Sequence, residues 1–310
     1  MFILRKKKYS SGQALLIILL TLTVVLTVVL SVVSRSITDI SVTTYQEDAQ
    51  RAFDAAEAGI ERVLLTGSDQ SDSLGDAEFD AKLSFPLPQS DQAVSPSDVL
   101  AGESATFWFV SQDASGDLFC SGDCLTASRF RRICWGQPGT SLDAYTPAIE
   151  ISVYYDEAAP QAVSSGDFSQ VKIARRAYDP NSGRLGSNNF RSASSCGTPL
   201  AGRDFAFATD NIDFDIDLPI PCESTVGCLL MAKVRLIYNH DSGPPPVSFP
   251  HPVGIEVQTI GGTHLPAQGT LINSIGEAGD TTRRVNVFQS YPEPPFVFEA
   301  AIFGKGGLSK

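Results

Sequence analysis

The sequence lacks the short motifs by which common enzyme classes are recognised. Its 310 residues contain no P-loop, no GxSxG elbow and no HExxH helix. The three histidines, His240, His251 and His264, lie in loop-like or turn-like sequence, and no nucleophile pattern stands beside them. We therefore expect surface histidines, no catalytic residue, no cofactor and a protein that is not an enzyme.

Positive charge is scarce beyond the amino terminus. The chain has 23 Lys and Arg against 35 Asp and Glu, a formal net charge of -12. An acidic body repels phosphate backbones. The stretch "SRFRRICW" at residues 128–135 is basic, but a single charged strand explains it, so we expect no nucleic-acid partner. Four cations precede residue 12: Arg5, Lys6, Lys7 and Lys8.

Charged residues are also absent between Lys8 and Arg35. Within this interval, residues 14–33 are apolar apart from three threonines and one serine. Twenty helical residues at about 1.5 Å each span about 30 Å, the thickness of the hydrocarbon layer of a bilayer. The basic residues before this segment predict a single-pass helix with its amino terminus in the cytoplasm and the remaining chain outside.

Three of the polar residues in this apolar segment, Thr23, Thr27 and Ser31, are spaced four apart and so share one helix face. Small residues along one face let helices approach closely in lipid. Alternatively, each hydroxyl bonds back to a carbonyl of its own helix and has no role in assembly. The sequence leaves both interpretations open.

The helical pattern continues beyond the apolar segment. Apolar residues recur at steps of three and four from Ile37 to Val63, with charged residues on the other face. Gly67 and the polar residues after it indicate the end of the helix. We expect one helix over residues 13–66, about 80 Å long at the standard rise. Its outer half is expected to pack a face containing Phe53 and Ile60 against the globular domain.

These features together resemble the type IV pilin-like proteins. A short basic leader ends at Gly12, an apolar helix starts at once from Gln13, and its continuation contains "AFDAAEAGIERVL" at residues 52–64. The sequence looks most similar to the PilX minor pilins and to the K-type pseudopilins of type II secretion, whose first helix commonly contains a similar "AAEAG" segment. The resemblance covers about the first 66 residues.

The resemblance implies a leader at residues 1–12, a pilin helix at 13–66 and an extracytoplasmic domain at 67–310. A prepilin peptidase would cut between Gly12 and Gln13 and methylate the new amino terminus. The retained helix would anchor the subunit in the bacterial cytoplasmic membrane and then pack among like helices in a fibre. Other pilin-like subunits and the fibre assembly platform would be its partners. An adhesive pilus at the cell surface, a DNA-uptake pilus and type II secretion all remain open.

The position of Ile17 bears on the role within such a fibre. Major pilins usually place Glu at the fifth position of the mature chain, where it meets the terminal amine of a neighbour. Ile17 occupies that position and cannot neutralise an amine. K-type pseudopilins are also apolar there and are associated with the fibre tip, so the resemblance implies a minor or priming subunit. The alternative is a membrane-tethered binding module or hydrolase.

Strand patterns dominate the chain beyond residue 67, where we find no resemblance. Short alternating or β-branched runs are separated by turn residues, which predicts an antiparallel sheet or sandwich. Together with the long helix, the fold class is α+β. Residues 67–76 and 86–98 are polar or rich in proline and are expected to be loops. The predicted strands are 105–113, 148–155, 171–178, 211–218, 229–238, 253–260, 269–275, 283–290 and 296–303.

All six cysteines follow the apolar segment. An even number in an exported domain predicts up to three disulfides, whose connectivity the sequence does not fix. Cys222 and Cys228 are spaced to close a short loop. Cys120 and Cys124 are one close pair, but a zinc site needs a second pair with matching spacing, so we expect no metal. The candidates are Cys120, Cys124, Cys134, Cys196, Cys222 and Cys228.

Three aspartates in "TDNIDFDIDLP" alternate with apolar residues, so Asp213, Asp215 and Asp217 are expected on one face of a strand. A row of carboxylates is one way to bind Ca²⁺. The other interpretation is the solvent face of a half-buried strand, and the absence of EF-hand spacing favours it. We therefore claim no ligand at these residues.

Overall fold

The structure is a computed structural model that describes residues 11–113, 116–120, 124–221, 227–241, 243 and 246–293. The chain forms two compact units. The first, the helix unit, holds the chain up to Leu65 with residues 69–82 and 273–285. The second, the sandwich unit, holds residues 66–68, 83–272 and the chain from 286 onward. A long helix followed by antiparallel sheets confirms the α+β class.

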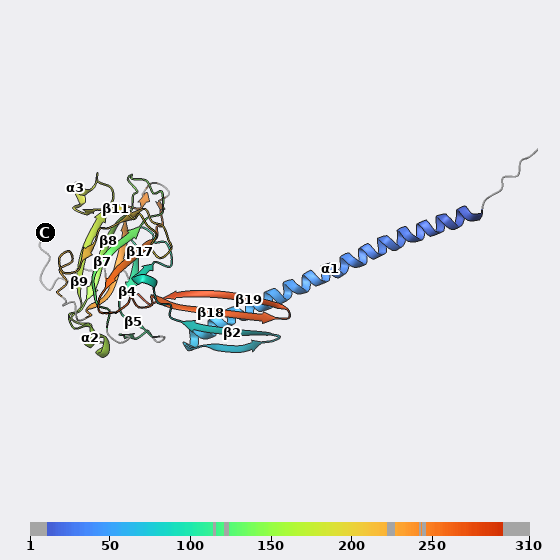
Figure 1. The fold of residues 1–310 in the computed structure, drawn as a ribbon, viewed down its shortest axis with the longest axis horizontal. Helices are drawn as coiled ribbons and strands as arrows, with labels where there is room; N and C mark the ends of the chain where they lie inside the picture. Colours follow the sequence, from blue (N-terminus) through green and yellow to red (C-terminus); the bar gives the residue numbers. More distant parts are fainter. Residues whose placement is uncertain are drawn as a thin grey trace, which may run out of the picture. The chain divides into compact units, whose positions relative to one another are not determined.

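The helix unit is built on α1, which runs without interruption over Ser11–Thr66 (Figure 1). Residues 14–58 contain neither proline nor glycine, so nothing interrupts the ladder of backbone hydrogen bonds. The helix ends where Gly67 adopts a left-handed φ of 65°. By length and composition α1 can cross a membrane once, since its most apolar stretch of 18 residues has a mean hydropathy of 3.0.

A four-stranded sheet of order β1-β2-β18-β19 covers the carboxyl-terminal part of α1 (Figure 1). On its inner face, strand β2 buries alternate residues. The prediction of a loop at 67–76 was wrong, because β1 forms a hairpin with β2 around Gly75. The residues of β1 are polar except Leu74 and largely exposed, so no apolar alternation signals the strand. The strands are β1 Gln70–Leu74, β2 Ala77–Ser84, β18 Gly269–Ala278 and β19 Thr281–Ser290.

Two large sheets form most of the described part of the sandwich unit. The first has the order β10-β9-β8-β14-β4, and the second has β11-β12-β7-β17-β3 with β13 added to β7. Adjacent strands are antiparallel except β10 and β9. The first sheet comprises β10 Arg191–Ser192, β9 Lys172–Asp179, β8 Ala148–Tyr155, β14 Leu229–Ile237 and β4 Ser104–Trp108. The second comprises β11 Ser194–Ser195, β12 Phe207–Ala208, β7 Ala127–Trp135, β17 Val253–Thr259, β3 Gln92–Val94 and β13 Ile212–Asp213.

Short elements complete this unit. Two small hairpins pair β5 with β6 and β15 with β16. Helices are brief, and none was expected from the sequence. The elements are β5 Ser111–Gln112, β6 Leu118–Phe119, β15 His240–Asp241, β16 Val247–Ser248, α2 Ala159–Ser165, α3 Leu185–Asn188 and the 3-10 turn Gln89–Asp91.

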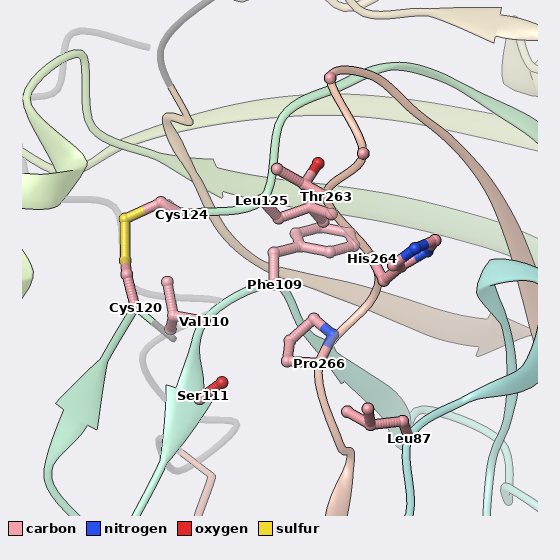
Figure 2. Close-up of a pocket in the computed structure, with 12 residues that line it drawn as sticks. Leu87, Phe109, Val110, Ser111, Cys120, Cys124, Leu125, Thr263, His264 and Pro266 are labelled. Atoms are coloured by element: carbon pink, nitrogen blue, oxygen red, sulfur yellow. A yellow bond between two sulfur atoms is a disulfide. The ribbon is translucent and has the colours of Figure 1, made fainter. Parts of the chain in front are cut away.

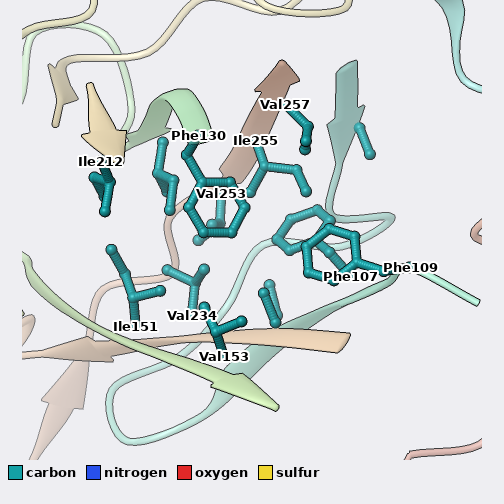
Figure 3. Close-up of a cluster of buried hydrophobic side chains, with 14 of the residues drawn as sticks. Phe107, Phe109, Phe130, Ile151, Val153, Ile212, Val234, Val253, Ile255 and Val257 are labelled. Atoms are coloured by element: carbon teal, nitrogen blue, oxygen red, sulfur yellow. The ribbon is translucent and has the colours of Figure 1, made fainter. Parts of the chain in front are cut away.

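Both sheets contribute to one apolar core (Figure 3). Ile151 and Val234 come from the first sheet, and Phe130 and Ile255 from the second, and all four are fully buried. Burial of each such side chain stabilises the fold by about 1.5–3 kcal/mol relative to exposure. The Trp135 indole also lies in this core and donates its N–H to the carbonyl of Pro147 at 2.8 Å.

Most predicted strands agree with the structure, since β8, β9, β14, β17, β18 and β19 fall where the sequence pattern indicates them. The expected strand 105–113 is divided between β4 and β5. The predicted strand 296–303 lies outside the described residues.

The prediction of a strand over 211–218 was wrong. Only Ile212–Asp213 is a strand, because the Asp213 carboxylate accepts the amides of Asp215 (3.1 Å) and Ile216 (3.3 Å) and bends the chain into a turn. Ile216, one of the apolar residues that alternate with the aspartates, is 81% exposed. The three aspartates therefore do not share a strand face.

Candidate functional site

The apolar part of α1 makes no packing contact within the described chain. Its large side chains between Leu15 and Tyr45 each keep about half or more of their surface exposed, and Ile17 is 61% exposed. The backbone of Gly12 and Gln13 belongs to α1, but their side chains are not described. The four cations at residues 5–8 lie outside the described residues.

The hydroxyls of Thr23 and Thr27 donate hydrogen bonds to backbone carbonyls of α1 itself. Thr23 donates to the carbonyls of Leu19 (3.1 Å) and Leu20 (2.8 Å). Thr27 donates to those of Thr23 (3.0 Å) and Val24 (2.8 Å). This is the geometry of the second interpretation, in which the hydroxyls satisfy their own backbone.

Small residues form the face of α1 that packs on the four-stranded sheet. Ala52, Ala55 and Ala56 are completely buried, and a Cβ on Gly59 would lie 2.5 Å from the Ser274 hydroxyl. The backbones of helix and sheet therefore approach closely, which a larger side chain would prevent. The "AAEAG" segment of the sequence contributes three of these residues.

Of the two residues expected on this face, Ile60 is buried, with 7% of its surface exposed. Phe53 is not buried, since 38% of its surface remains exposed. Successive residues of a helix are rotated by about 100° about its axis. The Phe53 side chain therefore projects beside the buried face on which Ala52 lies, and not into it. The apolar periodicity included Phe53 because the sequence alone does not reveal how narrow the covered face is.

An arginine secures the β1–β2 hairpin to the helix. Arg62 donates to the carboxylate of Asp72, and its guanidinium lies 5.3 Å from the centre of the Phe79 ring. The hydrogen bond from Arg62 lowers the pKa of the Asp72 carboxyl. The pair is exposed, so it orients the hairpin more than it stabilises it.

In the sandwich unit, a cavity of about 290 Å³ lies beside the Cys120–Cys124 disulfide (Figure 2). The Phe109 ring projects into this region, and apolar residues such as Leu125 and Pro266 form much of the lining (Figure 2).

Two polar side chains of this cavity have partners within the chain. His264 is mostly exposed, and its Nδ1 lies 3.4 Å from a carboxylate oxygen of Asp91. The Thr263 hydroxyl donates to the carbonyls of Thr126 (3.0 Å) and Ile260 (2.9 Å). The cavity thus has a mixed polar and apolar lining with one imidazole at its rim.

Asp213 and Asp217 pair with arginines of this chain and do not form the expected row of carboxylates. Asp217 accepts from Arg176 at 2.6 Å and lies 3.7 Å from Arg191, while Asp213 lies 3.5 Å from Arg129. The carboxylates are therefore neutralised by side chains of this chain. Within the described residues, no group of three or more potential metal ligands is found.

The buried histidine is a further correction to the sequence analysis. His251, expected at the surface, is 6% exposed and forms a β-bridge with Val99. Its Nδ1 accepts the amide of Gln137 at 3.1 Å. Burial lowers the pKa of its imidazole.

Disulfides join parts of the sandwich unit that the sequence could not pair. Cys120 bonds to Cys124 and Cys134 bonds to Cys196. Cys228 is also in a disulfide. Its predicted partner, Cys222, lies outside the described residues.

Comparison of the chain with protein-family models, with curated proteins and with solved structures finds no match. Function therefore has to be inferred from the helix, its sheet and the sandwich unit themselves.

Proposed function

We propose that this chain is a non-enzymatic minor pilin or pseudopilin, which enters a pilus-like or type II secretion fibre through its amino-terminal helix. Its partners are other pilin-like subunits, the prepilin peptidase and the fibre assembly platform. The peptidase removes residues 1–12 and leaves a methylated amino terminus at Gln13. The ectodomain lies outside the cytoplasmic membrane.

One observation carries the proposal: α1 is much longer than an anchor requires. Residues 14–33 suffice to cross a bilayer, and tight packing on the sheet begins only at Ala52. The 18 residues between them extend the helix by about 27 Å. This interval exposes Ile37 (61%), Ile40 (64%) and Tyr45 (58%).

A helix that serves only as a membrane anchor does not require these 18 additional residues with exposed apolar side chains. A solvated helix gains little stability from propensity alone and depends on packing of its apolar face. Neighbouring helices of the same kind would cover this face in a fibre. The exposed interval therefore favours assembly over a tethered binding module or hydrolase.

The first test is mass spectrometry of the amino terminus of the native protein. We expect the chain to start at a methylated Gln13. A Gly12→Val variant should keep its leader, whereas the matched Ser11→Ala variant should be processed normally. An intact Met1, or a cut after the apolar run, would overturn the proposal.

The second test separates assembly from anchoring. Ile40→Ser with Tyr45→Ser should leave membrane insertion intact but reduce the amount of the chain in sheared fibres. The control, Thr44→Ala with Gln46→Ala, changes neighbouring exposed residues without removing apolar surface. Fibre incorporation that is equal in the two double variants would favour the tethered alternative.

A further inference from the structure

An open groove of about 610 Å³ in the sandwich unit combines apolar walls with one guanidinium. We call it the Arg235 groove, after the only residue with a permanent positive charge among its lining residues. Its volume falls within the range of small-molecule sites, about 300–1,000 Å³. The apolar wall consists chiefly of Ile237, Pro246 and Val247.

Arg235 is oriented but not neutralised. Its Nε donates to the carbonyl of Gly102 at 3.1 Å, and within the described residues its guanidinium forms no ion pair. Three acidic residues near the groove have other partners: Glu150, the cross-strand partner of Arg235, lies 3.7 Å from Arg175. Glu103 accepts the amide of Leu100 at 3.1 Å, and Asp241 accepts the amide of Gly243 at 2.8 Å. The net charge of the chain is -12, so a guanidinium without an ion-pair partner gives this groove a local positive charge that can attract an anionic group.

A hydroxyl donor stands in the same groove. Ser248 accepts the amide of Ala101 at 3.0 Å, which fixes the oxygen and leaves its proton to donate. His240 pairs with Ser248 across the β15–β16 hairpin and is exposed. Arginine and serine are thus both present as donors in the lining of the groove.

The wall beside these donors is held rigidly. Tyr238 adopts a left-handed φ of 69°, which costs an aromatic residue energy and persists only where its surroundings impose it. The Arg184 guanidinium lies 4.4 Å from the centre of the Tyr238 ring. Arg184 is itself fixed by two hydrogen bonds to the buried carboxylate of Asp179. A wall that does not reorganise lowers the entropic cost of binding.

We propose that the Arg235 groove binds a small apolar acid, with its carboxylate on Arg235 and Ser248 and its aliphatic body on Ile237 and Val247. The planar fork of arginine matches a carboxylate. A phosphate would leave charge uncompensated by one arginine in an acidic protein. A sugar would leave most of its hydroxyls facing aliphatic side chains without partners. The ligand is either a free branched-chain acid or the carboxyl terminus of a polypeptide that ends in an apolar residue.

The test is calorimetric titration of the detergent-solubilised full chain. The probes are 4-methylpentanoate, N-acetyl-leucine and its matched amide, N-acetyl-leucinamide. We expect N-acetyl-leucine to bind about tenfold or more tightly than the amide, because a charge-assisted hydrogen bond distinguishes them. Equal affinity of acid and amide, or no binding of either acid, would overturn the proposal.

Variants assign the effect to the groove. Arg235→Met keeps the aliphatic stem and should abolish the preference for the acid, whereas Arg283→Met, an exposed arginine on β19, should keep it. Val247→Asp provides an independent check if Arg235→Met does not fold, since Val247 is 46% exposed and tolerates a polar side chain. It should weaken acid binding through like charge. An unchanged preference in both groove variants would refute the assignment.

A further arm distinguishes the two sources of the carboxylate. An acetylated pentapeptide that ends in leucine should bind more tightly than 4-methylpentanoate if the ligand is a polypeptide terminus. Comparable affinity would assign the groove to free acids. Both outcomes require that the acid binds more tightly than the amide, so each supports carboxylate binding by the groove. This binding does not depend on assembly of the chain into a fibre.

Discussion

Substitution of Gly276 by alanine should loosen α1 from its sheet. A Cβ at this position of β18 would overlap the carbonyl oxygen of Ala52 and lie 2.7 Å from the amide nitrogen of Ala56. Non-bonded heavy atoms normally lie about 3.5 Å apart, so the helix must retreat by at least about 0.8 Å. A gap of about 0.5–1 Å forfeits a quarter to a half of the dispersion energy of a contact.

The obstructing atoms belong to the helix backbone, so no side-chain rotation relieves the overlap. We therefore expect a loss near the upper end of the range for overpacking, about 2–3 kcal/mol in the free energy of local opening. That loss corresponds to about 30- to 150-fold faster amide exchange in peptides covering residues 52–63. Hydrogen exchange followed by mass spectrometry on the detergent-solubilised chain measures it.

The matched control is Gly186→Ala. A Cβ on Gly186 meets no atom within 4 Å, and its backbone does not require glycine. We expect this variant to leave exchange over residues 52–63 unchanged. If Gly276→Ala exchanges at the wild-type rate, the close approach of helix and sheet is refuted.

Three further predictions concern the sandwich unit. Asp179→Asn should cost about 3–5 kcal/mol in unfolding free energy, because it leaves Arg184 without the buried carboxylate that holds it. Burial holds the pKa of His251 below its ordinary 6.5, so its contribution to stability is complete above pH 6.5 and lost as the pH falls; His251→Gln should reduce that loss. Replacing Cys134 and Cys196 by serine removes a cross-link across 62 residues and should cost about 4 kcal/mol in a chain-entropy estimate.

Urea unfolding followed by tryptophan fluorescence checks all three. The two tryptophans, Trp108 and Trp135, are buried in the sandwich unit and report on it. Neutralising the exposed Lys172 should change the unfolding free energy by less than about 1 kcal/mol, which provides the control for Asp179. An Asp179→Asn midpoint equal to wild type, or a His251→Gln curve with the wild-type pH slope, would contradict the corresponding reasoning. For the disulfide, serine variants as stable as wild type would show that the loop is held by other contacts.

The parts of the fold that the sequence predicts correctly are those specified by local periodicity. Helix α1 shows apolar residues at steps of three and four over its outer half, and β8 and β14 have runs of apolar and β-branched residues. Strand β1 is missed because its stability comes from hydrogen bonds to β2, with largely exposed polar side chains. The turn after Asp213 is missed because a side-chain hydrogen bond overrides an apolar alternation.

Residues that depend on distant contacts are the ones the sequence does not place. His251 is buried because it bridges to Val99, about 150 residues earlier in the chain. Disulfide pairing likewise depends on which strands become neighbours. The Arg235 groove combines Gly102 with residues around 235–248, and no spacing rule connects these segments.

The connectivity of the helix unit has a consequence for biosynthesis. Strand β18 lies beside β2 in the sheet that covers α1, yet β2 ends at Ser84 and β18 begins only at Gly269. Long-range pairing of this kind is slow, because the intervening chain must first be ordered. The part of α1 around Ala52 and Ala56, which lies against Gly276 of β18, therefore stays uncovered until the ribosome has passed β18. Truncated or stalled products would expose this part of the helix, which would distinguish them from finished molecules.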